Sequence, residues 1–362
     1  MAGLDGVGEG SVRTMSSRYY QDPEVFEREK EKIFYRTWQF VAHVSALPDP
    51  GSFLTAQIAD ESLLVARGQD GEIRAFYNVC RHRAHRVAEG AGSCRSFVCP
   101  YHAWGYDLEG RLIAAPKTEQ VAGFDKTAVR LRPVRLEVFC GLIFVNLDDQ
   151  APAMDALYPG LAEEILAAKP RIAHMVPVFE DVIGHDCNWK VSVENFSECY
   201  HCPVVHKYVI ANLYAAEGYR IAIDGGVVRH SAVRRQEREV HGDLLIWFLW
   251  PNLAIEIFPM HRSLSVRHFR VEGPRRASYA YLWYADPDLS GAATEEVRDI
   301  GRKYRTTNGA EDARLVASVQ KGLESRAYDR GQLVITPEVT YQSEHAVAHF
   351  QALYLAALEG SG

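Results

Sequence analysis

Two short motifs, each pairing one Cys with one His, carry the clearest chemistry in this sequence. Cys80 with His82 and Cys99 with His102 together read C-x-H-x16-C-x-x-H. Two thiolates and two imidazoles can hold a [2Fe–2S] cluster, with both Cys on one iron and both His on the other. Because neutral imidazoles replace two anionic thiolates, such a cluster has a higher reduction potential than an all-Cys cluster. The motifs therefore predict electron transfer at a moderate potential.

The same four residues are also a possible ligand set for structural zinc. A zinc finger groups its two Cys together and its two His together, whereas each motif here carries one of each. Residues 73–79 (IRAFYNV) and 96–98 read as strands that enter the two motifs, and residues 104–114 read as a hairpin around Glu109-Gly110. Two loops carried by strands are typical of a Rieske [2Fe–2S] domain, so we predict the cluster and keep zinc as the alternative.

A second pair of histidines follows about a hundred residues later. Residues 188–206 read NWKVSVENFSECYHCPVVH and contain His201 and His206. On an ideal helix these two side chains lie about 140° apart. They reach one metal ion only if the helix is locally distorted, which Pro203 between them can cause. The spacing alone leaves open whether they bind metal.

A carboxylate further along the chain could complete a metal site. Residues 310–326 read as a helix, and Asp312 lies three, four and seven residues before members of its apolar face. A carboxylate on such a face must be paired or bound to metal. The other interpretation is a helix-start residue that favours the helix dipole. Glu311 and Glu324 fall nearer the polar side. The inward face contains Leu315, Val316, Val319 and Leu323.

Taken together, these motifs resemble the large subunit of Rieske non-haem iron oxygenases. The resemblance rests on the cluster motif, on N-W-K, E-N-F and ECYH-x4-H within residues 188–206, and on EDARLVASVQKGL at 311–323. It implies that His201, His206 and Asp312 hold a mononuclear iron as a 2-His-1-carboxylate triad with open positions for O₂ and substrate. It also implies a homotrimer in which Glu198 links His201 to His102 of the neighbouring subunit.

Glu198 precedes His201 by three residues, which on a continuous helix places both on nearly the same face. A surface glutamate is the alternative. Many ring-hydroxylating members carry Asp at this position, whereas this chain carries Glu. Glu198, the string ECYHC, the segment at 311–323 and SEHAVAHF at 343–350 together resemble the quaternary-ammonium branch. That branch includes carnitine, glycine-betaine and proline-betaine oxygenases. Gln351 departs from that branch, whose members often carry His. Aromatic residues at 246–250, Phe258 and 279–284 either form core or line the iron cavity, where they could cage a quaternary ammonium.

The resemblance implies a terminal oxygenase. Electrons from NAD(P)H pass through a separate flavin and iron–sulfur reductase to the cluster, then by Glu198 to iron, where O₂ hydroxylates a small substrate. For a betaine, hydroxylation beside nitrogen leads to N-demethylation or C–N cleavage. The alternatives are the large subunit of an aromatic-ring dioxygenase, with a small β subunit, and a non-catalytic Rieske electron carrier. The predicted triad and the long C-terminal region argue against the carrier.

The expected fold is α+β. We expect a flexible tail at 1–16, an N-terminal helix at 17–40 that packs with the catalytic domain, an all-β Rieske [2Fe–2S] domain at 41–150 rich in short β runs, and a catalytic domain at 151–362. In the catalytic domain strands alternate with helices, the first of which is expected at 154–168. The resemblance implies a helix-grip fold for this domain, with an antiparallel sheet around a helix.

Composition agrees with a cytoplasmic enzyme. The chain has 362 residues, 47% of them hydrophobic, which is enough for more than one core. Its net charge of −7 gives no sign of nucleic-acid binding. Seven Cys without a regular framework argue against a disulfide scaffold and for a reducing compartment. No apolar run approaches the ~18 residues of a membrane span, and the N-terminus lacks the apolar stretch of a signal peptide.

Overall fold

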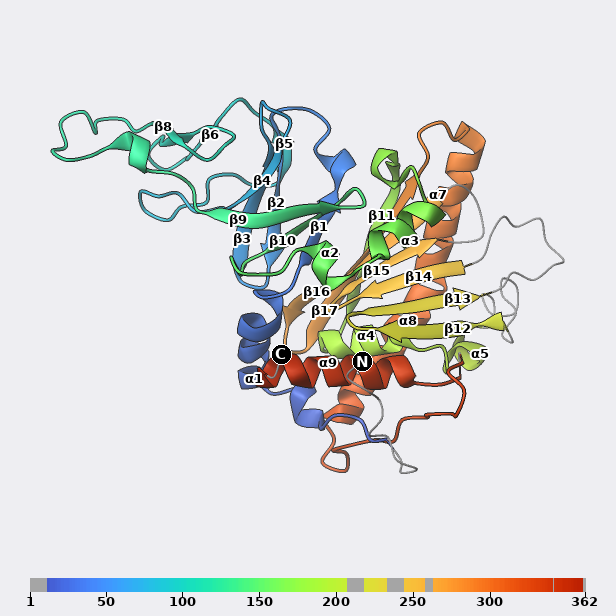
Figure 1. The fold of residues 1–362 in the computed structure, drawn as a ribbon. Helices are drawn as coiled ribbons and strands as arrows, with labels where there is room; N and C mark the ends of the chain where they lie inside the picture. Colours follow the sequence, from blue (N-terminus) through green and yellow to red (C-terminus); the bar gives the residue numbers. More distant parts are fainter. Residues whose placement is uncertain (1–11, 207–217, 233–243, 258–262, 341, 361–362) are drawn as a thin grey trace. The chain divides into compact units, whose positions relative to one another are not determined.

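The computed structural model describes residues 12–206, 218–232, 244–257, 263–340 and 342–360 (Figure 1). Its contacts divide the chain into a small unit, Phe34–His174, and a large unit made of Met1–Ile33 and Met175–Gly362. The expected boundaries at 40/41 and 150/151 differ from this division. Strand β1 (Gln39–His43) already pairs with β10 (Leu142–Asn146), and the His43 ring hydrogen-bonds the carbonyl of Ile172 at 2.8 Å. Both contacts attach to the small unit residues that lie outside the expected range of 41–150.

The small unit is built mainly from antiparallel strands. One sheet has seven strands in the order β1-β10-β9-β4-β3-β2-β5, and a second has the order β6-β7-β8. The strands not yet defined are β2 (Ser52–Ile58), β3 (Glu61–Arg67), β4 (Ile73–Tyr77), β5 (Ala91–Ser93), β6 (Phe97–Val98), β7 (Gly105–Tyr106), β8 (Leu112–Ala114) and β9 (Pro133–Phe139). Strands β4 and β6 run directly into the two Cys/His motifs, as predicted.

A turn at residues 107–111 forms the predicted hairpin between β7 and β8. The Asp107 carboxylate accepts the backbone N–H groups of Glu109 at 3.0 Å and Arg111 at 2.8 Å. Gly110 has φ +80, which side chains rarely adopt, and a Cβ there would lie 2.6 Å from the ring of Phe76. Local turn chemistry therefore determines where this hairpin closes.

One helix expected at residues 154–168 is instead two short helices of the small unit. Helix α2 (Met154–Leu157) and helix α3 (Leu161–Ala168) are separated by Gly160, which has φ +78. Gly160 is the N-cap of the second helix, and the apolar periodicity on either side of this break does not reveal it. The expectation of one continuous helix was wrong.

The large unit contains a seven-stranded antiparallel sheet in the order β11-β17-β16-β15-β14-β13-β12. Helix α4 packs against β16 and β17 and contacts helices α8 and α9, while α7 packs on β11 and β17. An antiparallel sheet with helices on it confirms the α+β expectation. The strands are β11 (Val176–His185), β12 (Arg220–Asp224), β13 (Val227–Ala232), β14 (Leu244–Leu249), β15 (Leu253–Ile257), β16 (Ser263–Gly273) and β17 (Arg276–Ala285). The helices are α4 (Trp189–Ser197), α5 (Cys202–Val205), α7 (Gly291–Thr306), α8 (Asn308–Leu323) and α9 (His345–Glu359).

The N-terminal segment is part of the large unit. Helix α1 (Pro23–Glu29) begins after Asp22, whose side chain accepts the N–H of Glu24, and Pro23 is in its first turn. At its end the buried Glu29 carboxylate binds the ammonium of Lys190 and accepts the indole N–H of Trp189 at 2.8 Å. These contacts join α1 to α4.

Residues 12–16, expected as part of a flexible tail, are anchored in the structure. The N–H of Thr14 hydrogen-bonds the carbonyl of Gly331, and the N–H of Met15 hydrogen-bonds the Gln351 side chain at 2.9 Å. Met15 is also buried. Residues 1–11 of the expected tail lie outside the described residues. Within the described ranges, we find no helix that is both long and apolar enough to cross a membrane.

Candidate cluster site and metal centre

The two Cys/His motifs form two loops of the small unit with matching backbones. The carbonyl of Cys80 accepts the N–H of Ala84 at 3.1 Å, and the carbonyl of Cys99 accepts the N–H of Ala103 at 3.0 Å. Both alanines have positive φ, +59 and +57. Two non-glycine residues in this strained region mark functional loops. The two loops therefore turn back in the same way after their Cys residues.

The loops bury their Cys and expose their His. Cys80 is 3% and Cys99 1% exposed, whereas His82 and His102 are exposed. The rings of His82 and His102 lie 4.6 Å apart between centroids, and His82 also stacks on Trp104. A cluster held here would have its Cys-bound iron inside the domain and its His-bound iron at the surface. Electrons could then enter or leave through the imidazoles.

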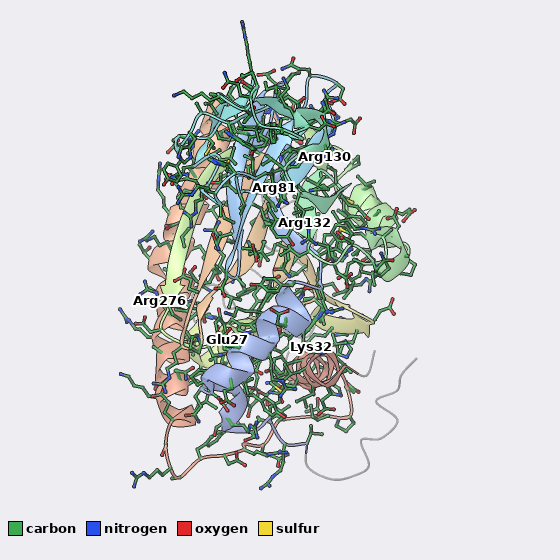
Figure 2. All side chains as sticks on the ribbon, turned by 90° about the vertical axis from the view of Figure 1, so that its left-hand side faces the viewer. Glu27, Lys32, Arg81, Arg130, Arg132 and Arg276 are labelled. Atoms are coloured by element: carbon green, nitrogen blue, oxygen red, sulfur yellow. A yellow bond between two sulfur atoms is a disulfide. The ribbon has the colours of Figure 1, made fainter. Side chains whose placement is uncertain are left out.

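The Tyr106 hydroxyl holds the first loop through contacts with Cys80 and Arg81. It lies 3.3 Å from the Cys80 sulfur and accepts the N–H of Arg81 at 2.9 Å. Burial, with Cys80 beside it, raises the pKa of Tyr106, so the hydroxyl keeps its proton and can donate it to the sulfur. Hydrogen bonds to sulfur ligands tune the reduction potential of such clusters. Arg81 itself is exposed, as are Arg130 and Arg132 elsewhere on this unit (Figure 2).

The arrangement of the four donors in two pairs favours a cluster over zinc. The buried Cys99 lies within hydrogen-bond reach of Cys80, and the His82 and His102 rings lie together at the surface. A zinc ion would need all four donors around one centre. A cluster spans two metal atoms, so donors that fall into a Cys pair and a His pair fit it.

The metal centre of the large unit begins where helix α4 ends. Glu198 follows α4 with an extended backbone (φ −128, ψ 161), and its carboxylate accepts the N–H groups of Tyr200 and His201. Helix α5 then starts with Pro203 in its first turn, so that His201 and His206 flank one helical turn. The two His therefore do not share a distorted helix, and Glu198 does not share a helical face with His201. Both expectations were wrong because α4 stops at Ser197.

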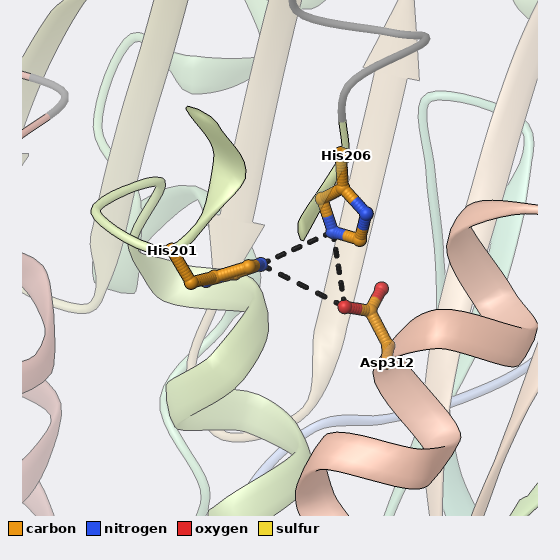
Figure 3. A group of neighbouring side chains, drawn as sticks. All are labelled: His201, His206 and Asp312. Carbon is orange, nitrogen blue, oxygen red and sulfur yellow. Dashed lines mark hydrogen bonds and ion pairs between the residues drawn. The ribbon is translucent and has the colours of Figure 1, made fainter. Parts of the chain in front are cut away.

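The structure brings His201, His206 and Asp312 together with the spacing of metal ligands (Figure 3). The Nε2 atoms of the two His lie 3.1 Å apart, and the Asp312 Oδ1 atom lies 3.0 Å from His206 Nε2 and 3.7 Å from His201 Nε2. Bonds of about 2.1 Å at right angles place donor atoms about 3 Å apart. Within the described part of the chain, Asp312 Oδ1 is buried without a hydrogen-bond partner, which an ion would correct. Two His and one Asp with room beyond them fit ferrous iron.

Two carboxylates orient the imidazoles. Glu198 Oε1 lies 2.5 Å from His201 Nδ1, and Glu311 Oε2 lies 2.8 Å from His206 Nδ1. Each carboxylate accepts the Nδ1 proton and leaves Nε2 free to face the metal. Burial lowers the pKa of His206, but Asp312 and Glu311 outweigh it, and the pKa is raised overall. The sequence did not reveal this role of Glu311, although its position beside Asp312 was a signal.

Helix α8 places Asp312 through its buried face. Asp312 is 6% exposed and lies in line with Val316, Gln320 and Leu323, which are also buried. Val319, expected on the inward face, is 49% exposed, because the buried stripe follows i, i+4, i+8 and i+11 instead. The Gln320 side chain accepts the N–H of Asn188 at 2.9 Å, directly before α4. This bond ties the helix of the carboxylate to the helix that leads to the histidines.

A disulfide between Cys199 and Cys202 brackets His201. The sequence argued against a disulfide scaffold, and Cys80, Cys94, Cys99, Cys140 and Cys187 are indeed free. The bridge was missed, although its C-x-x-C spacing was visible. The bridge joins residues only three positions apart and constrains the turn that carries His201. It is therefore a local cross-link and not part of a disulfide scaffold.

A cavity of about 120 Å³ opens on the metal centre. Besides the three candidate ligands, its lining includes Phe196, Glu256, Arg267 and Tyr304. On the other side of His201, a second cavity of about 350 Å³ is lined by Tyr20, Glu194 and Glu198 among others. Phe258, one of the aromatic residues predicted for core or cavity, lies outside the described residues. The smaller cavity is the candidate substrate site, since it reaches all three candidate ligands.

Comparison with known proteins agrees with both sites. Residues 37–125 match the Rieske [2Fe-2S] domain, and residues 172–360 match the ring hydroxylating alpha subunit (catalytic domain). The second match covers more than half of the chain and contains the three candidate metal ligands. The chain therefore belongs to the Rieske non-haem iron oxygenases. As the oxygenase component of that class, it is an oxidoreductase that uses a Rieske cluster, mononuclear iron, O₂ and electrons from NAD(P)H supplied by a separate reductase.

Individual relatives place it further within the family. The chain is 33% identical to the carnitine monooxygenase oxygenase subunit of Escherichia coli (strain K12) over 353 residues, which are 94% of this chain and 92% of that protein. It is 39% identical over 196 residues, 54% of this chain and 43% of the relative, to the glycine betaine monooxygenase oxygenase subunit of Chromohalobacter salexigens. A crystal structure of a quaternary ammonium Rieske monooxygenase with L-carnitine superposes with a TM-score of 0.88 at 30% identity, covering 96% of each chain.

Proposed function

We propose that this protein is the oxygenase component of a quaternary-ammonium monooxygenase. The observation that carries the proposal is the similarity to a carnitine monooxygenase subunit over 94% of the chain, which includes every candidate ligand. The substrate is a small betaine-like compound, and the bond oxidised is a C–H bond beside the nitrogen. The aromatic-ring dioxygenase is less well supported, because structures of naphthalene 1,2-dioxygenases that cover as much of this chain are only 20–23% identical to it, against 30–33% for the quaternary ammonium relatives.

The overall reaction determines what the site must supply. One O₂, two electrons and two protons convert the C–H bond to C–OH and release water. The hydroxylated carbon then carries both oxygen and nitrogen, and loss of the amine leaves an aldehyde. Iron at His201, His206 and Asp312 would activate O₂. The protein holds that ion with one carboxylate and two neutral imidazoles, which leaves coordination positions for O₂ beside the substrate cavity.

Glu198 is proposed to carry the electronic connection between subunits. Its Oε1 atom is used by His201 Nδ1 and its Oε2 atom by backbone N–H groups of the same loop. A carboxylate has about four acceptor positions, so a further donor can bind. We place His102 of a neighbouring protomer there, which requires a homotrimer whose head-to-tail contacts close into a ring. The dependence on NAD(P)H, a cofactor of the cell interior, supports a cytoplasmic location.

The test is a single turnover that needs no partner reductase. The purified protein is reduced at its cluster with dithionite, freed of excess reductant and mixed with O₂ and one substrate. Glycine betaine, carnitine, choline and benzoate form the panel, and mass spectrometry identifies the products. We expect a quaternary ammonium compound to give an amine and an aldehyde. Oxidation of benzoate, with every quaternary compound unchanged, would overturn the proposal in favour of ring hydroxylation.

A further inference from the structure

The cavity at the metal centre contains a buried pair of opposite charges. Arg267 on β16 and Glu256 on β15 form an ion pair with 3.1 Å between a guanidinium nitrogen and Glu256 Oε1, and their side chains are only 7% and 1% exposed. Ser265 donates its hydroxyl proton to Glu256 Oε2 at 2.5 Å. The strand register explains the contact, since Glu256 pairs with Ser265. Both charged residues line the same cavity as the three candidate iron ligands.

Aromatic rings surround this guanidinium. Its central carbon lies 4.8 Å from the ring centre of Phe196, 5.2 Å from Tyr279, 4.9 Å from Tyr281 and 4.9 Å from Tyr304. Each distance is within the range of a cation–π contact. These rings include aromatic residues that were candidates for caging a quaternary ammonium. The protein's own cation already occupies the cage, so these four rings hold Arg267 rather than the substrate.

The guanidinium retains an unused donor. The Nε atom of Arg267 is buried and has no hydrogen-bond partner among the residues that the structure describes. A buried N–H without an acceptor is costly, and carboxylates are the acceptors that match an arginine fork. A ligand carboxylate in the cavity would satisfy this donor. A ligand with only a positive charge would instead meet the like charge of Arg267.

We propose that Arg267 selects substrates that carry a carboxylate. The guanidinium binds the carboxylate of a betaine, while Glu256 keeps the pair neutral and draws the positive end of the same zwitterion. A cationic alcohol such as choline has the ammonium but offers no charge for Arg267. The inference rests on the proposed function, because it names which quaternary ammonium compounds the same cavity accepts.

A double substitution separates this role from simple folding. Arg267→Gln alone would leave Glu256 buried and unpaired, which is strongly destabilising. The variant Arg267→Gln/Glu256→Gln removes both charges together. Arg267→Lys keeps the charge but loses the planar fork. The matched control is Arg276→Gln/Glu272→Gln, which removes an ion pair of the same unit with a 72% exposed arginine.

The measurements are kcat/KM for glycine betaine and for choline, and calorimetric binding of both compounds. A charge-assisted hydrogen bond corresponds to about a 10- to 150-fold preference. The wild type and the control should prefer glycine betaine by about that factor, and the double variant should lose the preference through KM and binding. Arg267→Lys should fall between them.

Each other outcome has a definite meaning. If the double variant lowers the rates for both compounds equally and keeps the preference, Arg267 is structural and the inference is overturned. Equal use of both compounds by the wild type would also overturn it. If the wild type binds and oxidises none of glycine betaine, carnitine and choline, the proposed function fails. Comparison of benzoate with benzyl alcohol then tests Arg267 separately. If Arg267 selects carboxylates, the wild type should prefer benzoate to benzyl alcohol. Equal use of these two compounds would overturn the inference.

Discussion

Replacement of Asp312 by Asn should remove most of the iron-dependent stabilisation without lowering the stability of the metal-free protein. Asp312 Oδ1 lies 3.0 Å from His206 Nε2, is buried, and has no hydrogen-bond partner among the residues that the structure describes. Asn keeps the size of the side chain and removes its charge. In the absence of iron the substitution removes a buried charge that is incompletely hydrogen-bonded, so the melting temperature should not fall. With iron it removes a direct ligand, so the affinity for Fe(II) should fall.

The magnitude follows from binding linkage. Removing a group that only orients a metal ligand typically weakens metal binding about 10- to 100-fold, so a lost ligand should cost at least about 100-fold. At an Fe(II) concentration 100 times the wild-type Kd, iron stabilises the wild type by about 2.7 kcal/mol and the variant by about 0.4 kcal/mol. For a unit of this size these energies correspond to shifts in melting temperature of about 5–11 °C and about 1–2 °C.

The assay is anaerobic thermal unfolding with and without Fe(II), with the visible absorption of the cluster as a check that the small unit is intact. Glu311→Gln is the matched control, because its amide oxygen can still accept the Nδ1 proton of His206. Its binding should weaken by about 10-fold or less, which leaves a shift of about 3–6 °C. If Asp312→Asn keeps the wild-type shift while Glu311→Gln loses it, the ligand has been assigned to the wrong carboxylate.

Three further outcomes are expected. Cys80→Ser should remove the red-brown colour and acid-labile sulfide while the large unit keeps its thermal response to Fe(II); colourless wild-type protein with stoichiometric zinc would contradict the cluster. Glu198→Gln should keep both metal sites but greatly slow oxidation of the prereduced cluster in a single turnover, and unchanged kinetics would exclude this electron route. Burial raises the pKa of Glu194 from 4.5 to about 7, so the folded protein binds this proton more tightly than the unfolded chain, and stability falls as pH rises through that interval. Glu194→Gln should therefore stabilise the protein by about 1–2 kcal/mol at pH 8, after allowance for water in the adjoining cavity, and by nothing near pH 4.5; equal melting shifts at both values would refute this.

The outer carboxylates hold the candidate metal ligands in place through hydrogen bonds. Glu198 and Glu311 each contact the Nδ1 atom of one imidazole. They are distant in the sequence, because Glu198 follows α4 and Glu311 lies on α8. The Nε2 atoms therefore already face Asp312. Because this geometry is set by hydrogen bonds, the ion should bind to a largely formed site, and metal removal should leave the backbone of the large unit in place.

The sequence by itself determined the cluster loops. Cys80, His82, Cys99 and His102 lie within one short stretch, and the strands that enter the loops and the hairpin that follows have local signals in β-rich residues and turn residues. Local chemistry of this kind can be read directly. The inward position of Asp312 could also be predicted, because helical periodicity relates it to the apolar residues that follow.

Only the tertiary structure decided how distant residues meet. His206 and Glu311 are 105 residues apart, and no periodicity relates them. The end of α4 at Ser197 depends on a side chain that captures backbone N–H groups, which a helical pattern does not reveal. Arg267 looked like an ordinary strand residue, yet the sheet and α7 enclose it in aromatic rings beside the metal centre. Periodicity predicts which way a side chain points within its own element, whereas packing between elements determines what it meets.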